Sequence, residues 1–202
     1  MATIRYVNVI IPEAERLSSL GGISHDLEAC IASVRRLLAD RLSDLVLSDA
    51  LYTHALIRYA CCFKGGIRVV KAADLTSSLS SEELTNHSFF LDYRDKHIAH
   101  SVNAFEYHQL SVWLSPEERG RGVSSVSLGS HYVMLPAADV LLRLQTLAEK
   151  MLRWVESEIA TERLRFQTLV EERFSLDDLY SRETATPPEV ALEDVARRRK
   201  PA

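Results

Sequence analysis

Apolar residues recur every three to four positions along much of the chain, which is the period of a helix with one buried face. Residues 24–42 carry such a stripe, and Ser24 is suited to be the N-cap of a helix there. Residues 48–63 repeat the pattern, and Gly65 and Gly66 are expected to end that helix. The first third of the chain is therefore predicted to hold two consecutive helices.

A third helix is predicted to start at Ser80 or Ser81 and to run to about His100. Glu82 and Glu83 fall in its first turn, where negative charge suits the helix dipole. This helix would carry the most unusual segment of the chain at its C-terminal end.

The period then changes from helical to strand-like. Residues 105–114 and 123–135 are rich in aromatic and β-branched side chains, and the segment SPEERGRG separates them. Two such runs around a loop containing proline and glycine predict a β-hairpin over about residues 105–135.

Residues 137–174 form a single helical pattern of about 38 residues, or roughly 57 Å at about 1.5 Å per residue. A helix of that length is expected to bend, to break near Thr161, or to project into a partner. The fold class is therefore predicted as mainly α, a bundle of four to five helices with an inserted hairpin. Residues 1–180 would form one helical domain, and the polar residues 181–202 a mobile tail.

Composition restricts where such a protein works. No apolar run approaches the roughly 20 residues that a membrane helix needs, so no membrane partner is expected. Cys30, Cys61 and Cys62 are odd in number and form no Cys-x-x-Cys motif, which favours buried thiols in the cytoplasm. The net charge of −4 means that any contact with RNA must come from a local basic site.

Such a site is offered by residues 91–106, which read LDYRDKHIAHSVNAFE. Arg94 and His100 are six residues apart, about 240° around a straight helix, and so do not share one face. If both act on one phosphate, the helix must distort or end there, or a second copy must complete the site.

These residue types suit RNA cleavage without a metal ion. The ribose 2′-OH would attack the adjacent phosphate, and a histidine would move a proton, since its ordinary pKa is about 6.5. An arginine would hold the phosphate oxygens through its planar fork. A short acid beside the arginine could orient the histidine or the arginine itself.

The segment resembles the active motif of HEPN proteins, whose signature is an arginine, often followed by a short polar residue, and then a histidine after four to six residues. Here Asp95 follows Arg94, and five residues separate Arg94 from His100. RDKHIAHS is most similar to the bacterial abortive-infection subgroup. The resemblance implies a helical bundle, commonly a homodimer, in which two motif copies meet in a cleft and cleave RNA without cofactors. It assigns Arg94 and His100 as the catalytic pair and Asp95 as the residue that positions them.

Other residues would support this pair, and each has an ordinary alternative. His97 could assist catalysis or lie on a solvated face, and Lys96 could neutralise RNA or simply be solvated. Tyr93 could support the site or belong to the core or a dimer seam. Arg58 shares a helix face with His54 and could line a cleft or lie at the surface.

Arg94, Asp95 and His100 could themselves be a surface salt bridge and a helix-capping histidine. A zinc site could be built on His97 and His100 with Asp92 or His108. Metal sites usually need three or four ligands, and neither of these candidates is a strong third ligand. No metal is therefore expected.

The functional prediction is a metal-independent endoribonuclease that cleaves RNA through 2′-OH attack, in the setting of a toxin or phage-defence effector. Its expected partners are RNA, a second copy of the chain, and an antitoxin or regulatory protein. The alternative is a catalytically inactive HEPN-like module for RNA binding or protein assembly.

Overall fold

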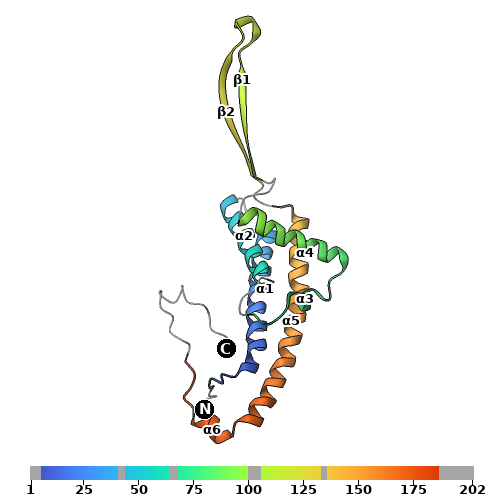
Figure 1. Ribbon diagram of the computed structural model, residues 1–202, viewed down its shortest axis with the longest axis vertical. Coiled ribbons are helices and arrows are strands. Elements are labelled where there is room, and N and C mark those ends of the chain that lie inside the picture. The colour runs from blue at the N-terminus through green and yellow to red at the C-terminus, as the bar shows by residue number, and fades with distance from the viewer. Residues whose placement is uncertain (1–5, 41–43, 64–67, 100–105, 133–135, 187–202) are drawn as a thin grey trace. The chain divides into compact units, whose positions relative to one another are not determined.

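The computed structural model describes residues 6–40, 44–63, 68–99, 106–132 and 136–186 (Figure 1). It confirms a mainly helical fold with an inserted two-stranded hairpin. The regular elements are α1 (Glu15–Asp40), α2 (Leu45–Cys61), α3 (Ala72–Thr76), α4 (Ser81–Tyr93), β1 (Glu106–Leu114), β2 (Val123–Tyr132), α5 (Ala138–Arg173) and α6 (Leu176–Ser181). Short turns precede α1 (Pro12–Ala14), follow α4 (Arg94–Ile98) and lie in the hairpin loop (Glu117–Arg119).

The chain divides into two compact units. The first unit comprises Met1–Glu28, Cys61–Ser78 and Glu149–Ala202, and the second comprises Ala29–Ala60 and Leu79–Ala148. Because the unit boundaries fall inside α1 and α5, each of these helices contributes residues to both units.

The first unit is built around the N-terminal half of α1. Leu20, Ile23 and Leu27 are fully buried there. Asp26, on the same helix, is also buried and forms an ion pair with Arg68. The guanidinium of Arg68 additionally donates to a backbone carbonyl 2.9 Å away, that of Cys61. A buried carboxylate is thus paired rather than isolated, as its burial requires.

The second unit contains the predicted site, and α2 and α4 form its aromatic core. Tyr52 and Tyr59 lie seven residues apart on α2, so they face the same side of the helix. Both are fully buried, as is Phe90 of α4, whose ring centroid lies 6.2 Å from that of Tyr59 in an edge-on arrangement. This face of α2 therefore fixes the position of α4 through aromatic contacts.

Helix α4 begins where the sequence predicts. Ser80 is its N-cap, and the Ser80 hydroxyl accepts from the backbone N–H of Glu83 at 3.2 Å while the Glu83 carboxylate accepts from the backbone N–H of Ser80 at 2.7 Å. This reciprocal capping box satisfies two backbone donors that would otherwise lack partners.

The starts predicted for the first two helices were wrong. α1 begins at Glu15 and runs through Ser24, whose hydroxyl donates to the Glu28 side chain at 3.1 Å instead of capping the helix. α2 begins at Leu45, because the Asp44 carboxylate accepts from two backbone N–H groups, at 2.9 and 3.0 Å. The actual cap of α2 therefore lies upstream of the predicted start.

The hairpin follows the prediction closely. β1 and β2 pair antiparallel, with Leu110 opposite Leu128 and Val112 opposite Val126. The register shifts by one residue between Trp113 and Leu114, beside the loop. The loop itself uses the positive φ of a glycine, Gly120 at 94°, which a residue with a Cβ rarely adopts.

Helix α5 is continuous, so the break expected near Thr161 is absent from it. The Thr161 hydroxyl donates to the backbone carbonyl of Ser157 at 3.1 Å, inside the helix. Within the part of the chain that the structure describes, no helix combines the length and the apolar character needed to cross a bilayer. After α6, Ala185 is buried and its N–H donates to the carbonyl of Tyr6 at 2.9 Å, which ties the start of the predicted tail to the first unit.

Candidate functional site

The predicted motif lies on a local distortion of the helix. α4 ends at Tyr93, and Arg94–Ile98 continue it as a single π-helical turn. The N–H of Ala99 donates to the carbonyl of Arg94 at 3.0 Å, a bond between residues i+5 and i. Such turns are rare and often occur at functional sites. His100, the predicted proton carrier, lies outside the described residues.

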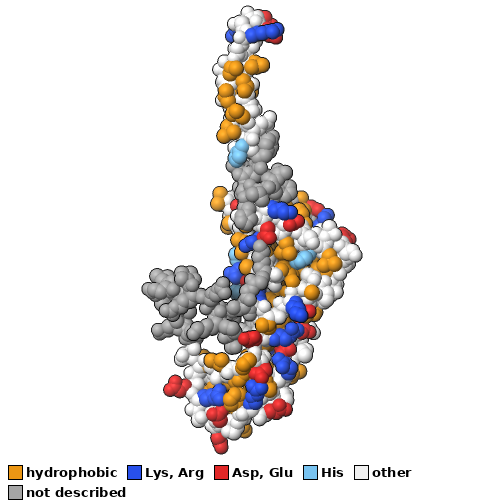
Figure 2. Space-filling model, viewed as in Figure 1, with side chains coloured by type: hydrophobic (Ala, Val, Ile, Leu, Met, Phe, Trp, Pro, Cys, Tyr) orange, Lys and Arg blue, Asp and Glu red, His pale blue; other side chains and the backbone are white. Residues whose placement is uncertain are grey.

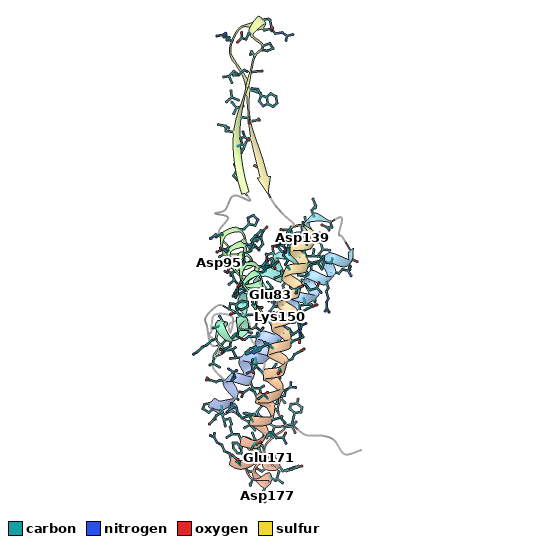
Figure 3. All side chains as sticks on the ribbon, turned by 90° about the vertical axis from the view of Figure 1, so that its right-hand side faces the viewer. Glu83, Asp95, Asp139, Lys150, Glu171 and Asp177 are labelled. Atoms are coloured by element: carbon teal, nitrogen blue, oxygen red, sulfur yellow. The ribbon has the colours of Figure 1, made fainter. Side chains whose placement is uncertain are left out.

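Arg94 and Asp95 interact directly at the start of this turn, at the C-terminal end of the α4 ribbon where Figure 3 labels Asp95. The Nη1 atom of Arg94 donates to Oδ1 of Asp95 at 2.9 Å, and the two side chains are 26% and 43% exposed. The acid therefore orients the arginine, which is one of the two roles considered for it from the sequence.

The Nε atom of Arg94 is buried and has no hydrogen-bond acceptor among the described residues. A buried donor on a charged group that lacks an acceptor carries a free-energy cost. The guanidinium is thus held at Nη1 by an acid, while its Nε is enclosed and lacks an acceptor among the described residues.

Tyr93 is a core residue. It is buried, and its ring centroid lies 5.5 Å from that of Tyr52 and 5.9 Å from that of Phe89. Burial, and to a smaller extent the negative charge of Asp49, raises the pKa of the Tyr93 phenol, so it stays neutral at physiological pH. Its role in the site is to anchor the turn that follows it.

His97 packs against this anchor. Its ring centroid lies 4.9 Å from that of Tyr93, with the two planes at 68°, and the residue is partly exposed. Contact with a buried ring restricts the orientations that the imidazole can adopt. His97 is therefore a positioned residue beside Arg94, not a freely solvated one.

Lys96 fits its ordinary alternative. Its Nζ atom lies 3.2 Å from Oδ1 of Asp92, one helical turn earlier, and both side chains are more than half exposed. Exposed pairs of this kind contribute about 0–1 kcal/mol to stability. Lys96 is a solvated surface charge in the free protein.

Arg58 lies on a different face of α2 from the two buried tyrosines. It directly precedes Tyr59, and successive residues of a helix differ by about 100° in direction. Its Nε–H donates to Nε2 of His54 at 3.2 Å, and Nδ1 of His54 lies 2.9 Å from the hydroxyl of Ser33 on α1. Arg58 thus belongs to a network directed at α1, and these contacts do not join it to the motif.

One polar pair in the aromatic core was not identified from the sequence. The hydroxyl of Tyr59 lies 2.8 Å from Nδ1 of His87, and their rings are in edge-on contact. Burial lowers the pKa of His87 below its ordinary value. A tyrosine repeated at seven-residue spacing, Tyr52 and Tyr59, was the available signal for this face.

Among the described residues, no group of three or more His, Cys, Asp or Glu side chains is placed to hold a metal ion. Comparison with protein-family models, curated proteins and solved structures found no match for this chain.

Proposed function

We propose that this protein is an endoribonuclease that needs no metal ion and that uses Arg94 and His100. The proposal is supported above all by the state of the Arg94 guanidinium: Nη1 is fixed by Asp95, while the buried Nε has no acceptor among the described residues. The Arg94 side chain is 26% exposed, so its exposed edge can receive a phosphate, and a movement of the side chain would let Nε donate to the phosphate as well, since arginine binds phosphate through its planar fork.

The chemistry is an internal transfer at phosphorus. The ribose 2′-OH attacks the neighbouring phosphate and the 5′-oxygen leaves, so the products end in a 2′,3′-cyclic phosphate and a 5′-OH. His100 moves a proton in this reaction, and Arg94 stabilises the negative charge that grows on the phosphate oxygens. Asp95 keeps the guanidinium in place, and His97 supports the site from its position against Tyr93.

The setting that we propose is the bacterial cytoplasm, where a toxin or phage-defence effector would act on RNA under the control of an antitoxin or another regulatory protein. The structure shows no disulfide at Cys30, Cys61 or Cys62, all of which lie among the described residues, and this is consistent with a reducing compartment.

Cleavage of a mixed set of single-stranded RNAs tests the proposal. Arg94→Ala and His100→Ala should each reduce the rate by about 10²-fold or more, the usual contribution of an electrostatic or acid–base group. Asp95→Ala should reduce the rate less than either, because it removes orientation and not a reacting group. His97→Ala should have the smallest effect of the four.

Matched controls separate chemistry from general loss of charge. Arg143→Ala breaks an exposed pair with Asp139, at 3.2 Å on α5, and His25→Ala removes an exposed histidine of α1. Both should cleave at the wild-type rate. A 2′-deoxy nucleotide at the cut site should abolish cleavage, because the internal nucleophile is gone. If His100→Ala cleaves as fast as His25→Ala, the proposed mechanism is wrong.

A binding module without catalysis is the second candidate. It is favoured by the net charge of −4, because the chain as a whole has no excess of positive charge to attract RNA substrates and a role in protein assembly needs none. Binding of RNA that weakens in Arg94→Ala, with no cleavage by the wild type under any tested condition, would support this candidate over the enzyme.

A further inference from the structure

The hairpin carries a continuous apolar face. Residues directly opposite each other in an antiparallel pair lie on the same face, and alternate residues of one strand share it. The register therefore joins six aliphatic side chains, each between 50% and 73% exposed: Leu110, Val112, Leu114, Val123, Val126 and Leu128. Figure 2 shows hydrophobic side chains gathered along the hairpin.

The opposite face is mostly polar. It carries Gln109, Ser111, Ser125 and Ser127, and the indole N–H of Trp113 donates to the Ser127 hydroxyl at 2.9 Å. An isolated two-stranded hairpin is at best marginally stable in water, and a hydrophobic face normally needs another layer to cover it. We therefore expect the apolar face of this hairpin to be covered by another layer.

We infer that the partner is the hairpin of a second copy of this chain, and that the two apolar faces pack together as a two-layer sandwich. Sheets packed face to face lie about 10 Å apart, with aliphatic side chains interdigitated between them. Leu110, Val112, Val126 and Leu128 supply such a layer from each copy without any polar group in its centre.

The charges of the hairpin favour this partner over RNA or an anionic membrane. Neither strand contains Lys or Arg, and Glu106 is the one Asp or Glu in their sequences. The loop carries two acids and two arginines, with Arg121 3.1 Å from Glu117. Two such loops can approach without net repulsion, whereas a surface that binds phosphate groups needs excess positive charge.

The available area predicts how tight this pairing is. A buried aliphatic side chain removes about 100 Å² of apolar area from water. Six side chains that are about two thirds exposed then offer roughly 400 Å² per copy, and two faces roughly 800 Å². Stable interfaces bury about 1,200–2,000 Å² in total. The hairpins alone should therefore form an exchanging dimer that depends on concentration.

This surface is independent of the ribonuclease proposal, because no hairpin residue takes part in the proposed chemistry. Sedimentation velocity of the full chain at increasing concentration tests it. The mass should move from 22.8 kDa toward twice that value within the micromolar range. A species that stays at 22.8 kDa up to 200 µM would overturn the inference.

Two neighbouring substitutions form a matched pair, since they add the same charge to opposite faces of β1. Leu110→Lys places an ammonium group in the apolar layer and should raise the dimer dissociation constant by at least tenfold. Gln109→Lys should change it by less than about threefold. Val126→Lys, on the other strand, repeats the test independently of any local effect at Leu110. Equal effects of the Leu110 and Gln109 variants would show that the apolar face is not the interface.

Co-sedimentation with vesicles of phosphatidylcholine and phosphatidylglycerol tests the alternative that the apolar face binds a membrane. The wild type should remain in the supernatant. Binding to vesicles that Leu110→Lys abolishes, together with a monomeric wild type, would assign the face to a membrane and overturn the dimer. Far-ultraviolet circular dichroism of each variant checks that the helical elements are intact.

Discussion

The two buried tyrosines of α2 should respond with opposite signs to the same chemical change. The hydroxyl of Tyr52 is buried and has no hydrogen-bond partner among the described residues. Burial, and to a smaller extent the neighbouring Tyr93, raises the pKa of this phenol, so the group is neutral. In the unfolded chain water satisfies the hydroxyl, and on folding that hydrogen bond is lost. Tyr52→Phe should therefore stabilise the protein.

The magnitude follows from the cost of an unsatisfied polar group. A buried donor or acceptor left without a partner costs about 1–3 kcal/mol. Tyr52→Phe keeps the ring and its edge contact with Tyr93, 5.5 Å between centroids, and removes only that cost. We expect the free energy of unfolding to rise by about 1 kcal/mol, which raises the melting temperature by about 2–4 °C in a chain of this size.

Tyr59→Phe is the matched control on the same helix. The Tyr59 hydroxyl lies 2.8 Å from Nδ1 of His87, so its removal breaks a hydrogen bond and leaves a partly buried imidazole nitrogen without that partner. The free energy of unfolding should fall by about 1 kcal/mol. The two variants should thus differ by about 2 kcal/mol, although both lose a single oxygen atom.

Urea unfolding followed by circular dichroism measures both changes. The midpoint should move up in Tyr52→Phe and down in Tyr59→Phe, with unchanged slopes, since similar surface is exposed on unfolding. A fall of the Tyr52→Phe midpoint as large as that of Tyr59→Phe would refute the reasoning. It would show that the Tyr52 hydroxyl is hydrogen-bonded in the folded protein.

Three further outcomes are expected. Burial lowers the pKa of His87 below its ordinary value of 6.5, so below that pH the unfolded chain takes up more protons than the folded one. The urea midpoint should therefore fall as the pH drops from 6.5, and it should fall less steeply in His87→Gln. Asp26→Ala leaves Arg68 without its carboxylate and should lower the free energy of unfolding by about 3 kcal/mol, the lower end for a buried pair, because the Arg68 side chain is 22% exposed. The control Arg143→Ala breaks an exposed pair and should lower it by less than about 1 kcal/mol, so equal losses in urea titrations would contradict the prediction. Chelation with EDTA should leave RNA cleavage unchanged, because the proposed nucleophile is the 2′-OH and no metal-bound water is used; loss of cleavage that zinc restores would overturn the metal-free mechanism.

The elements predicted well from the sequence are those with strong local signals. The β-branched runs on either side of SPEERGRG gave the hairpin to within a few residues, and Ser80 with Glu83 gave the start of α4. In both cases neighbouring residues decide the structure, through strand propensity and turn residues or through a capping box.

The start of α1 was missed because its local signals conflict with its packing. Gly21 and Gly22 are poor helix formers, and Ser24 just after them resembles an N-cap. In the folded protein Leu20 and Ile23 are fully buried on either side of the two glycines, and their burial outweighs the propensity cost of about 1 kcal/mol per glycine. Tertiary contacts of this kind are not visible in a local pattern.

The candidate site, too, was predictable where local sequence decides its structure and not where contacts between helices do. Its residue types could be read from the sequence, and the offset of six residues between Arg94 and His100 indicated that a regular helix would not serve both. The kind of distortion could not be predicted, because a π-helical turn differs from an α-helical one by a single shifted hydrogen bond, here from Ala99 to Arg94. A turn closed by an i+5 bond holds more residues than the 3.6 of an α-helix, so the angles of a regular helix do not apply within Arg94–Ile98. The anchor that precedes the turn is the buried ring of Tyr93, and its ring partner on α2, Tyr52, lies about forty residues earlier in the chain. The directions of the side chains in the turn Arg94–Ile98 therefore depend on packing between helices, and residues 91–106 alone do not contain that information.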